Sequence, residues 1–136
     1  WVVHRARATT MLLFACLVVP IMFIQMNGVG FWGAVALVSL AAASHQAWSA
    51  NIFTTVSDMF PKKAVGSVTG IGGMAGAVGG ALIASFTGNV LAFFEKQGNI
   101  KAGYSILFVI AGSAYLLAWV LMRVIAPGMK RVEHLD

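Results

Sequence analysis

Four apolar runs, separated by short polar stretches, make up most of the chain. They cover about residues 8–26, 31–53, 65–94 and 102–126. A helix needs roughly 20 apolar residues to cross the hydrocarbon core of a bilayer, and each run is close to that length or longer. Pro20 falls inside the first run, where a membrane helix tolerates a kink. The pattern therefore predicts an all-α integral membrane bundle of four transmembrane helices.

Polar side chains interrupt the second run from residue 44 onward. Counting from Phe31 places His45 near the bilayer midplane. At about 100° per residue the polar groups cover a broad arc of the helix, and in lipid they are costly unless they face protein, water or a ligand. We expect a substrate cavity lined by His45, Gln46, Trp48, Ser49 and Asn51. The alternative is that these groups only tie neighbouring helices together through polar contacts.

Residues 58–63 are predicted to form a loop at one membrane face. Pro61 ends the preceding helix, and Lys62 and Lys63 follow it directly. Asp58 and the two lysines are interpreted as a solvated helix end, with a gating ion pair as the alternative.

The third run is rich in glycine, and several of its glycines are four residues apart. This small-xxx-small spacing is typical of membrane helices that approach each other closely. It predicts helix packing through Gly66, Gly70, Gly72, Gly73, Gly76 and Gly80. A compatible interpretation is that the same smooth surface lets helices slide during transport.

Composition and charge agree with a membrane protein and fix an expected orientation. Hydrophobic residues make up 60% of the chain and charged residues 10%, far from the soluble norm. The net charge of +5 does not predict nucleic-acid binding, because the basic residues lie at the ends of apolar runs. By the positive-inside rule we expect a multi-pass protein of the inner (plasma) membrane with both ends of the chain cytoplasmic. The basic residues predicted to share the cytoplasmic face are Arg5, Arg7, Lys62, Lys63, Arg123, Lys130 and Arg131.

No enzyme, metal or cofactor pattern emerges from the sequence, so neither catalytic residues nor cofactors are predicted. The acidic residues fall outside the apolar runs, and the three histidines lie in separate segments. Cys16 lies inside the first run and is expected to be a small buried packing residue. A proton carrier usually needs an ionisable group within the membrane, and His45 is the one candidate. We expect the proton-coupling group to lie outside this chain.

The segment HQAWSANIFTTVSDMFPKKAVGSVTGIGGMAGAVGG, which begins at His45, resembles the tenth and eleventh helices of hexuronate transporters. These are sugar-acid/proton symporters of the anion:cation symporter branch of the major facilitator superfamily. The resemblance implies a twelve-helix fold of which residues 1–136 form the last four helices. It also implies that Trp48 and Ser49 contribute to the substrate cavity, while the groups that bind the proton and the carboxylate belong to the amino-terminal half.

The resemblance implies proton-coupled symport of a small organic anion, a hexuronate such as glucuronate or galacturonate, by alternating access. The implied partners are the lipid bilayer and the remaining amino-terminal helices. The chain opens at Trp1 without an initiator methionine, and we expect it to be a fragment that is inactive alone. The alternative is a complete four-span protein, either a small drug exporter or a non-transporting assembly subunit.

Overall fold

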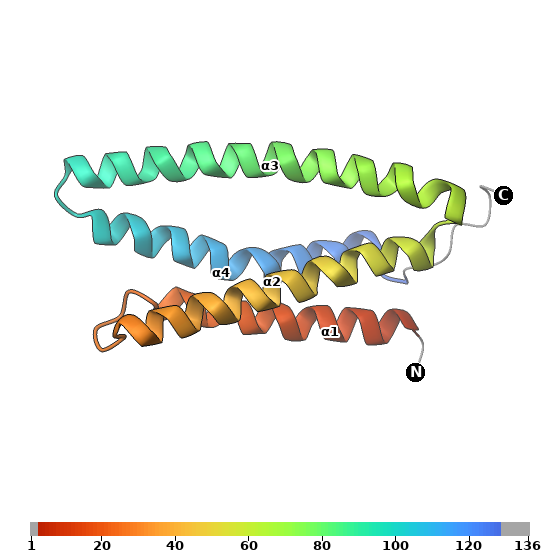
Figure 1. The fold of residues 1–136 in the computed structure, drawn as a ribbon, viewed down its shortest axis with the longest axis horizontal. Coiled ribbons are helices and arrows are strands. Elements are labelled where there is room, and N and C mark those ends of the chain that lie inside the picture. Colours follow the sequence, from red (N-terminus) through yellow and green to blue (C-terminus); the bar gives the residue numbers. More distant parts are fainter. Residues whose placement is uncertain (1–2, 129–136) are drawn as a thin grey trace.

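The computed structural model of the chain describes residues 3–128, and within that range the chain is all-helical, as predicted. Four long α-helices run up and down, and a short 3₁₀-helix continues the first of them (Figure 1). Their bounds are α1 Val3–Val18, η1 Val19–Phe23, α2 Phe31–Met59, α3 Lys62–Lys96 and α4 Ile100–Ile125.

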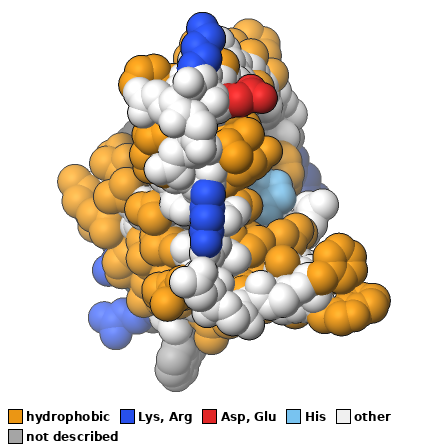
Figure 2. Space-filling model, turned by 90° about the vertical axis from the view of Figure 1, so that its left-hand side faces the viewer, with side chains coloured by type: hydrophobic (Ala, Val, Ile, Leu, Met, Phe, Trp, Pro, Cys, Tyr) orange, Lys and Arg blue, Asp and Glu red, His pale blue; other side chains and the backbone are white. Residues whose placement is uncertain are grey.

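Within residues 3–128, three helical segments are long and apolar enough to cross a membrane. They are Val3–Phe23, Lys62–Lys96 and Ile100–Ile125. The predicted second span, α2, is not among them although it has 29 residues, because polar side chains in its second half lower its hydropathy. Figure 2 views the end that carries the η1–α2 and α3–α4 turns and shows many exposed hydrophobic side chains beside a few charged ones. These features indicate a membrane protein.

At Pro20 the first helix changes from α-helical to 3₁₀ geometry, whereas the sequence predicted only a kink. The proline lies in the first turn of η1. Proline has no N–H for the i→i−4 hydrogen bond, so the regular α-helix cannot continue through it unchanged. The helix then ends at Phe23, earlier than the predicted residue 26. Gly28, with a φ of 102°, makes the turn toward α2, a conformation that favours glycine.

The connection between α2 and α3 is shorter than the predicted loop of residues 58–63. Only Phe60 and Pro61 leave the helical conformation, with φ and ψ of −113° and 147° at Phe60. The proline ring disfavours the helical conformation for the residue before it, so the break is confined to this pair. Asp58 therefore belongs to the last turn of α2, and Lys62 and Lys63 to the first turn of α3.

The hydrophobic core lies where α1, α2 and α4 meet. Met11, Ala15 and Trp48 are buried there, and side chains of α4 pack against them. The indole N–H of Trp119 in α4 donates a hydrogen bond of 2.8 Å to the carbonyl oxygen of Ala8 in α1. At Gly112 a Cβ atom would lie 2.6 Å from Cγ of Met22, so η1 and α4 approach each other at a site that excludes a side chain.

α3 stands apart from this core. It meets α4 and α2 mainly near its two ends, which short connections join to them (Figure 1). Within the described chain no residue of α3 is buried. Its 35 residues give a length of about 50 Å at 1.5 Å per residue, well beyond the roughly 30 Å of a hydrocarbon core.

The glycines of α3 make no close packing contact in the described part of the chain. No heavy atom outside the local helix backbone lies within 4 Å of the position that a Cβ would occupy at Gly66, Gly70, Gly72, Gly73, Gly76 or Gly80. The predicted packing through these glycines is therefore not made by α1, α2 or α4, and any helix that uses this surface lies outside residues 3–128.

The helix order gathers basic residues at one end of the structure. Arg5, Arg7, Lys62, Lys63 and Arg123 lie toward the end that carries the α2–α3 connection, whereas Lys96 and Lys101 lie at the opposite end (Figure 1). Lys130 and Arg131 fall outside the described residues. The charge asymmetry used for the topology is thus present in the fold, and the assignment of this end to the cytoplasm stays a prediction.

Candidate functional site

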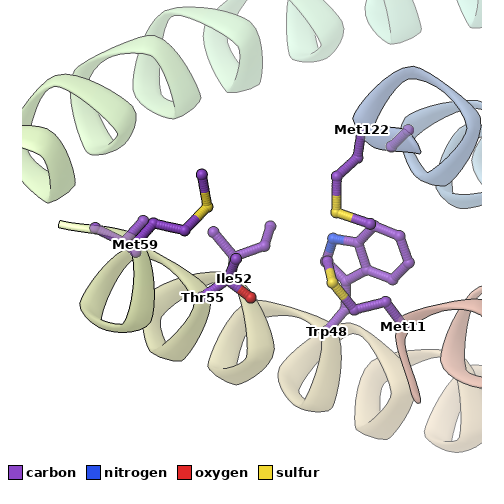
Figure 3. Close-up of a pocket in the computed structure, with 8 residues that line it drawn as sticks. Met11, Trp48, Ile52, Thr55, Met59 and Met122 are labelled. Carbon is purple, nitrogen blue, oxygen red and sulfur yellow. The ribbon is translucent and has the colours of Figure 1, made fainter. Parts of the chain in front are cut away.

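A cavity of about 300 Å³ lies between α1, α2 and α4 (Figure 3). Trp48, Ile52, Thr55 and Met59 come from one face of α2, because spacings of four, three and four residues return to the same side of a helix. The full lining consists of Met11, Trp48, Ile52, Thr55, Val56, Met59, Ala118 and Met122.

The lining is apolar apart from two groups, the Thr55 hydroxyl and the Trp48 indole N–H. The Thr55 hydroxyl donates a hydrogen bond of 2.7 Å to the carbonyl oxygen of Asn51 in its own helix. The three methionines place flexible, polarizable thioether groups around the rest of the space. No charged side chain lines this cavity, so its chemistry does not suit an organic anion.

Trp48 is the one predicted substrate-cavity residue that lines the cavity. It is 6% exposed, and its ring meets that of Tyr115 edge to face with centroids 5.4 Å apart. Met11 and Met122 lie beside the indole, and Met59 lies farther along the cavity (Figure 3). Trp48 therefore belongs both to the hydrophobic core and to the cavity wall.

His45 lies outside the cavity and contacts α4. Its Nδ1 is hydrogen-bonded to the hydroxyl of Tyr115, and either group can donate, depending on the histidine tautomer. The two residues lie near the middle of α2 and of α4, and the histidine ring is exposed on its other side. The contact joins the predicted polar cluster to a tyrosine that the sequence did not single out.

The other three predicted residues point in different directions. Gln46 is exposed and lies about 160° around α2 from Trp48. Asn51 donates a hydrogen bond of 2.9 Å to the carbonyl oxygen of Ala47 in the same helix, and Ser49 is half-buried. The described helices thus bring only Trp48 to the cavity, and a common substrate cavity for all five residues stays a prediction.

Part of the cavity could be found from the sequence and part could not. The stripe Trp48, Ile52, Thr55 and Met59 follows helical spacing within one segment. Met11 and Met122 come from helices more than 100 residues apart in the chain, and only the packing of α1 against α4 brings them together. No spacing rule within one helix could have paired them.

An ion pair joins α1 to α2 at the basic end of the structure. Nη2 of Arg7 lies 3.0 Å from Oδ2 of Asp58, and Nε of the same arginine donates a hydrogen bond of 3.1 Å to that oxygen. Asp58 is exposed in the last turn of α2, and its ion-pair partner in the described chain is Arg7, not Lys62 or Lys63 as in the alternative of a gating ion pair. Both side chains stay partly exposed, at 28% and 44%, so the pair stabilises the fold only weakly.

Neither metal nor thiol chemistry is indicated among residues 3–128. No group of three His, Cys, Asp or Glu side chains there could hold a metal ion. Cys16 is exposed, and the expectation of a buried packing residue is wrong, because this side of α1 faces away from α2 and α4.

No protein-family model, curated protein or solved structure matches the chain.

Proposed function

We propose that this chain forms part of the helical bundle of a proton-coupled symporter that carries a sugar acid, a hexuronate such as glucuronate or galacturonate, by alternating access. The position of His45 and Gln46 carries the proposal. Both side chains are exposed at the middle of α2, which lies beside helices apolar enough to cross a membrane. Such groups are costly against lipid, and a polar pathway completed by further helices removes that cost.

The sugar-acid class rests on the resemblance of the segment from His45 to hexuronate transporters. The apolar cavity beside Trp48 does not support anion binding, so we place the solute on the polar side of α2, near His45 and Gln46. A carboxylate needs a positive charge or several N–H donors there. In this proposal the remaining amino-terminal helices supply that group.

In this proposal the amino-terminal helices also supply the proton-coupling group. Among residues 3–128 the acidic side chains Asp58 and Glu95 lie in the last turns of α2 and α3, away from the middle of the bundle. Within the polar cluster His45 is the titratable group, and its contact with Tyr115 fits a hydrogen-bonding role. α3 supports a larger bundle, because its glycine surface meets no helix of the described chain.

The two alternatives of a complete four-span protein are less well supported. A small drug exporter would carry a glutamate within its first span, and Val3–Phe23 has no acidic residue. An assembly subunit needs no polar pathway, and His45 and Gln46 would then be packed dry against neighbouring helices. Both are exposed in the described chain.

The test is uptake of radiolabelled glucuronate and galacturonate into proteoliposomes under an imposed proton gradient, with the chain joined to its remaining helices. Uptake should follow the gradient and should fall about tenfold in His45→Ala or Gln46→Ala, as expected for one lost hydrogen bond to a charged solute. Thr54→Ala, at an exposed residue about 180° from His45 and about 80° from Gln46 around α2, is the matched control and should transport normally. Normal uptake in both test variants would exclude this site, and absence of gradient-driven uptake would exclude the function.

A further inference from the structure

The indole N–H of Trp48 is a strong donor without a protein acceptor. Among residues 3–128 the indole N–H of the partly buried Trp119 donates to Ala8, whereas Nε1 of the buried Trp48 has no hydrogen-bond acceptor in the protein. No fully enclosed side-chain nitrogen or oxygen in this range lacks a partner, so Nε1 must border open space. Trp48 itself is more than nine-tenths buried, and that space is the cavity.

The direction of this donor is defined. The indole nitrogen lies on the edge of the ring that faces Ile52, and the thioethers of Met11 and Met122 lie beside that edge (Figure 3). Buried tryptophan N–H groups usually have a hydrogen-bond partner, because leaving the donor unpaired forfeits the bond that it makes in water. The remaining polar group of the wall, the Thr55 hydroxyl, already donates to its own helix.

The other residues that line the cavity disfavour a charged ligand. Three methionines, an isoleucine, a valine and an alanine line it, and no basic or acidic side chain does. An ion would lose its hydration there without a counter-charge. Flexible thioethers instead adapt to aromatic and alkyl surfaces of different shapes.

We propose that this cavity binds a neutral, apolar small molecule with one hydrogen-bond acceptor, which accepts the Trp48 N–H. The volume of about 300 Å³ is enough for a substituted benzene or a short acyl ester, since an engineered cavity of about 150 Å³ holds benzene. The shared chemistry is an apolar body with a carbonyl or ether oxygen, and it could come from a membrane lipid ester or from a free aromatic compound. The inference does not rest on the proposed function, because the solute of that proposal is an anion.

The test is photolabelling with benzophenone, a neutral aromatic ketone, of the purified protein in lipid nanodiscs, followed by peptide mass spectrometry. Label is expected on Met11, Met59 or Met122. Met74 in α3 is 70% exposed and serves as the internal control, because it reports the probe dissolved in the bilayer. Methyl benzoate should compete for the cavity label, whereas propylbenzene, of similar size without an acceptor, should compete about fivefold less well, the worth of one ordinary hydrogen bond.

Two substitutions distinguish the contribution of the Trp48 N–H from the contribution of the cavity volume. Trp48→Phe keeps an aromatic ring but removes the N–H, and it should make methyl benzoate no better a competitor than propylbenzene. Trp32→Phe, at a tryptophan that is 79% exposed, is its matched control and should leave the preference unchanged. Ala118→Leu fills the cavity and should abolish the cavity label, whereas Ala111→Leu, elsewhere on α4, should not.

Competition by methyl laurate shows whether the natural ligand is a lipid ester or a free aromatic compound. If it competes better than methyl benzoate, the natural ligand is a lipid ester, and the reverse order assigns a free aromatic compound; both support the site. Equal labelling of Met74 and the cavity methionines would overturn the proposal. Full labelling in a folded Ala118→Leu protein, or an unchanged preference for methyl benzoate in Trp48→Phe, would do the same.

Discussion

The cluster of α1, α2 and α4 and the long helix α3 are both rich in apolar residues, but only the cluster buries them. In the cluster Met11 and Ala15 are 1% and 0% exposed, whereas in α3 Ile71 and Met74 are 68% and 70% exposed. The contrast extends to glycine: Gly112 lies against Met22, and Gly76 has open space around it.

Apolar character alone does not make a residue of a membrane helix part of a core. Lipid is as apolar as leucine, so burial against protein must come from close packing. α3 is also apolar, although it is richer in glycine, and no residue of it is buried in the described chain. Substitutions in the cluster should therefore differ in effect from matched substitutions at residues that no neighbouring helix contacts.

Trp48→Ala should have the largest effect. We expect a loss of about 3 kcal/mol of stability, at the lower end of the range for a large aromatic truncation, because lipid offers the unfolded side chain an apolar surrounding too. Trp32→Ala, at a residue that is 79% exposed, should cost well below 1 kcal/mol. Denaturation in detergent, followed by near-ultraviolet circular dichroism, measures both. Equal losses would refute the assignment of Trp48 to the core.

Gly112→Ala should cause the second-largest loss of stability. The added Cβ would meet Met22 at 2.6 Å and 2.9 Å, so the methionine side chain must move, and we expect a loss of about 1–2 kcal/mol. Gly76→Ala meets no atom and should be neutral or stabilising by up to about 1 kcal/mol, because alanine favours the helix. Thermal unfolding of both variants gives the comparison. Marked destabilisation by Gly76→Ala would reveal a helix packed on α3 that residues 3–128 do not include.

The ion pair should have the smallest effect. Arg7→Ala and Asp58→Asn should each cost less than about 1 kcal/mol, because both side chains are partly exposed. A double-mutant cycle should give a coupling energy of about 0.2–1 kcal/mol that falls as salt is added. Lys62→Ala paired with Asp58→Asn is the control and should show no coupling. A larger coupling with Lys62 than with Arg7 would refute the assignment of Arg7 as the partner of Asp58 and favour the alternative ion pair with the lysines.

Much of the fold could be predicted from the sequence, because long apolar runs and their turn residues act locally. The break at Pro61 is such a case, since proline acts on its immediate neighbours. The exact bounds were less accurate: α2 continues to Met59 through residues whose polarity suggested a loop. Polarity does not end a helix when its backbone hydrogen bonds remain available.

The candidate site was only partly accessible from the sequence. Trp48 stood out because it lies among polar neighbours, and it does line the cavity. Tyr115, Met11 and Met122 did not stand out, because each looks like an ordinary residue of an apolar run. Their importance comes from contacts between helices far apart in the chain, which no single-segment pattern contains.

The contact between η1 and α4 also carries a consequence for how this sequence can vary. Pro20 produces the 3₁₀ turn, the turn places Met22, and Met22 occupies the space that a side chain at Gly112 would need. We therefore expect these three positions to be coupled in evolution. A residue larger than alanine at position 112 should occur together with a smaller residue at position 22 or without proline at position 20, so the three positions should covary among homologous sequences.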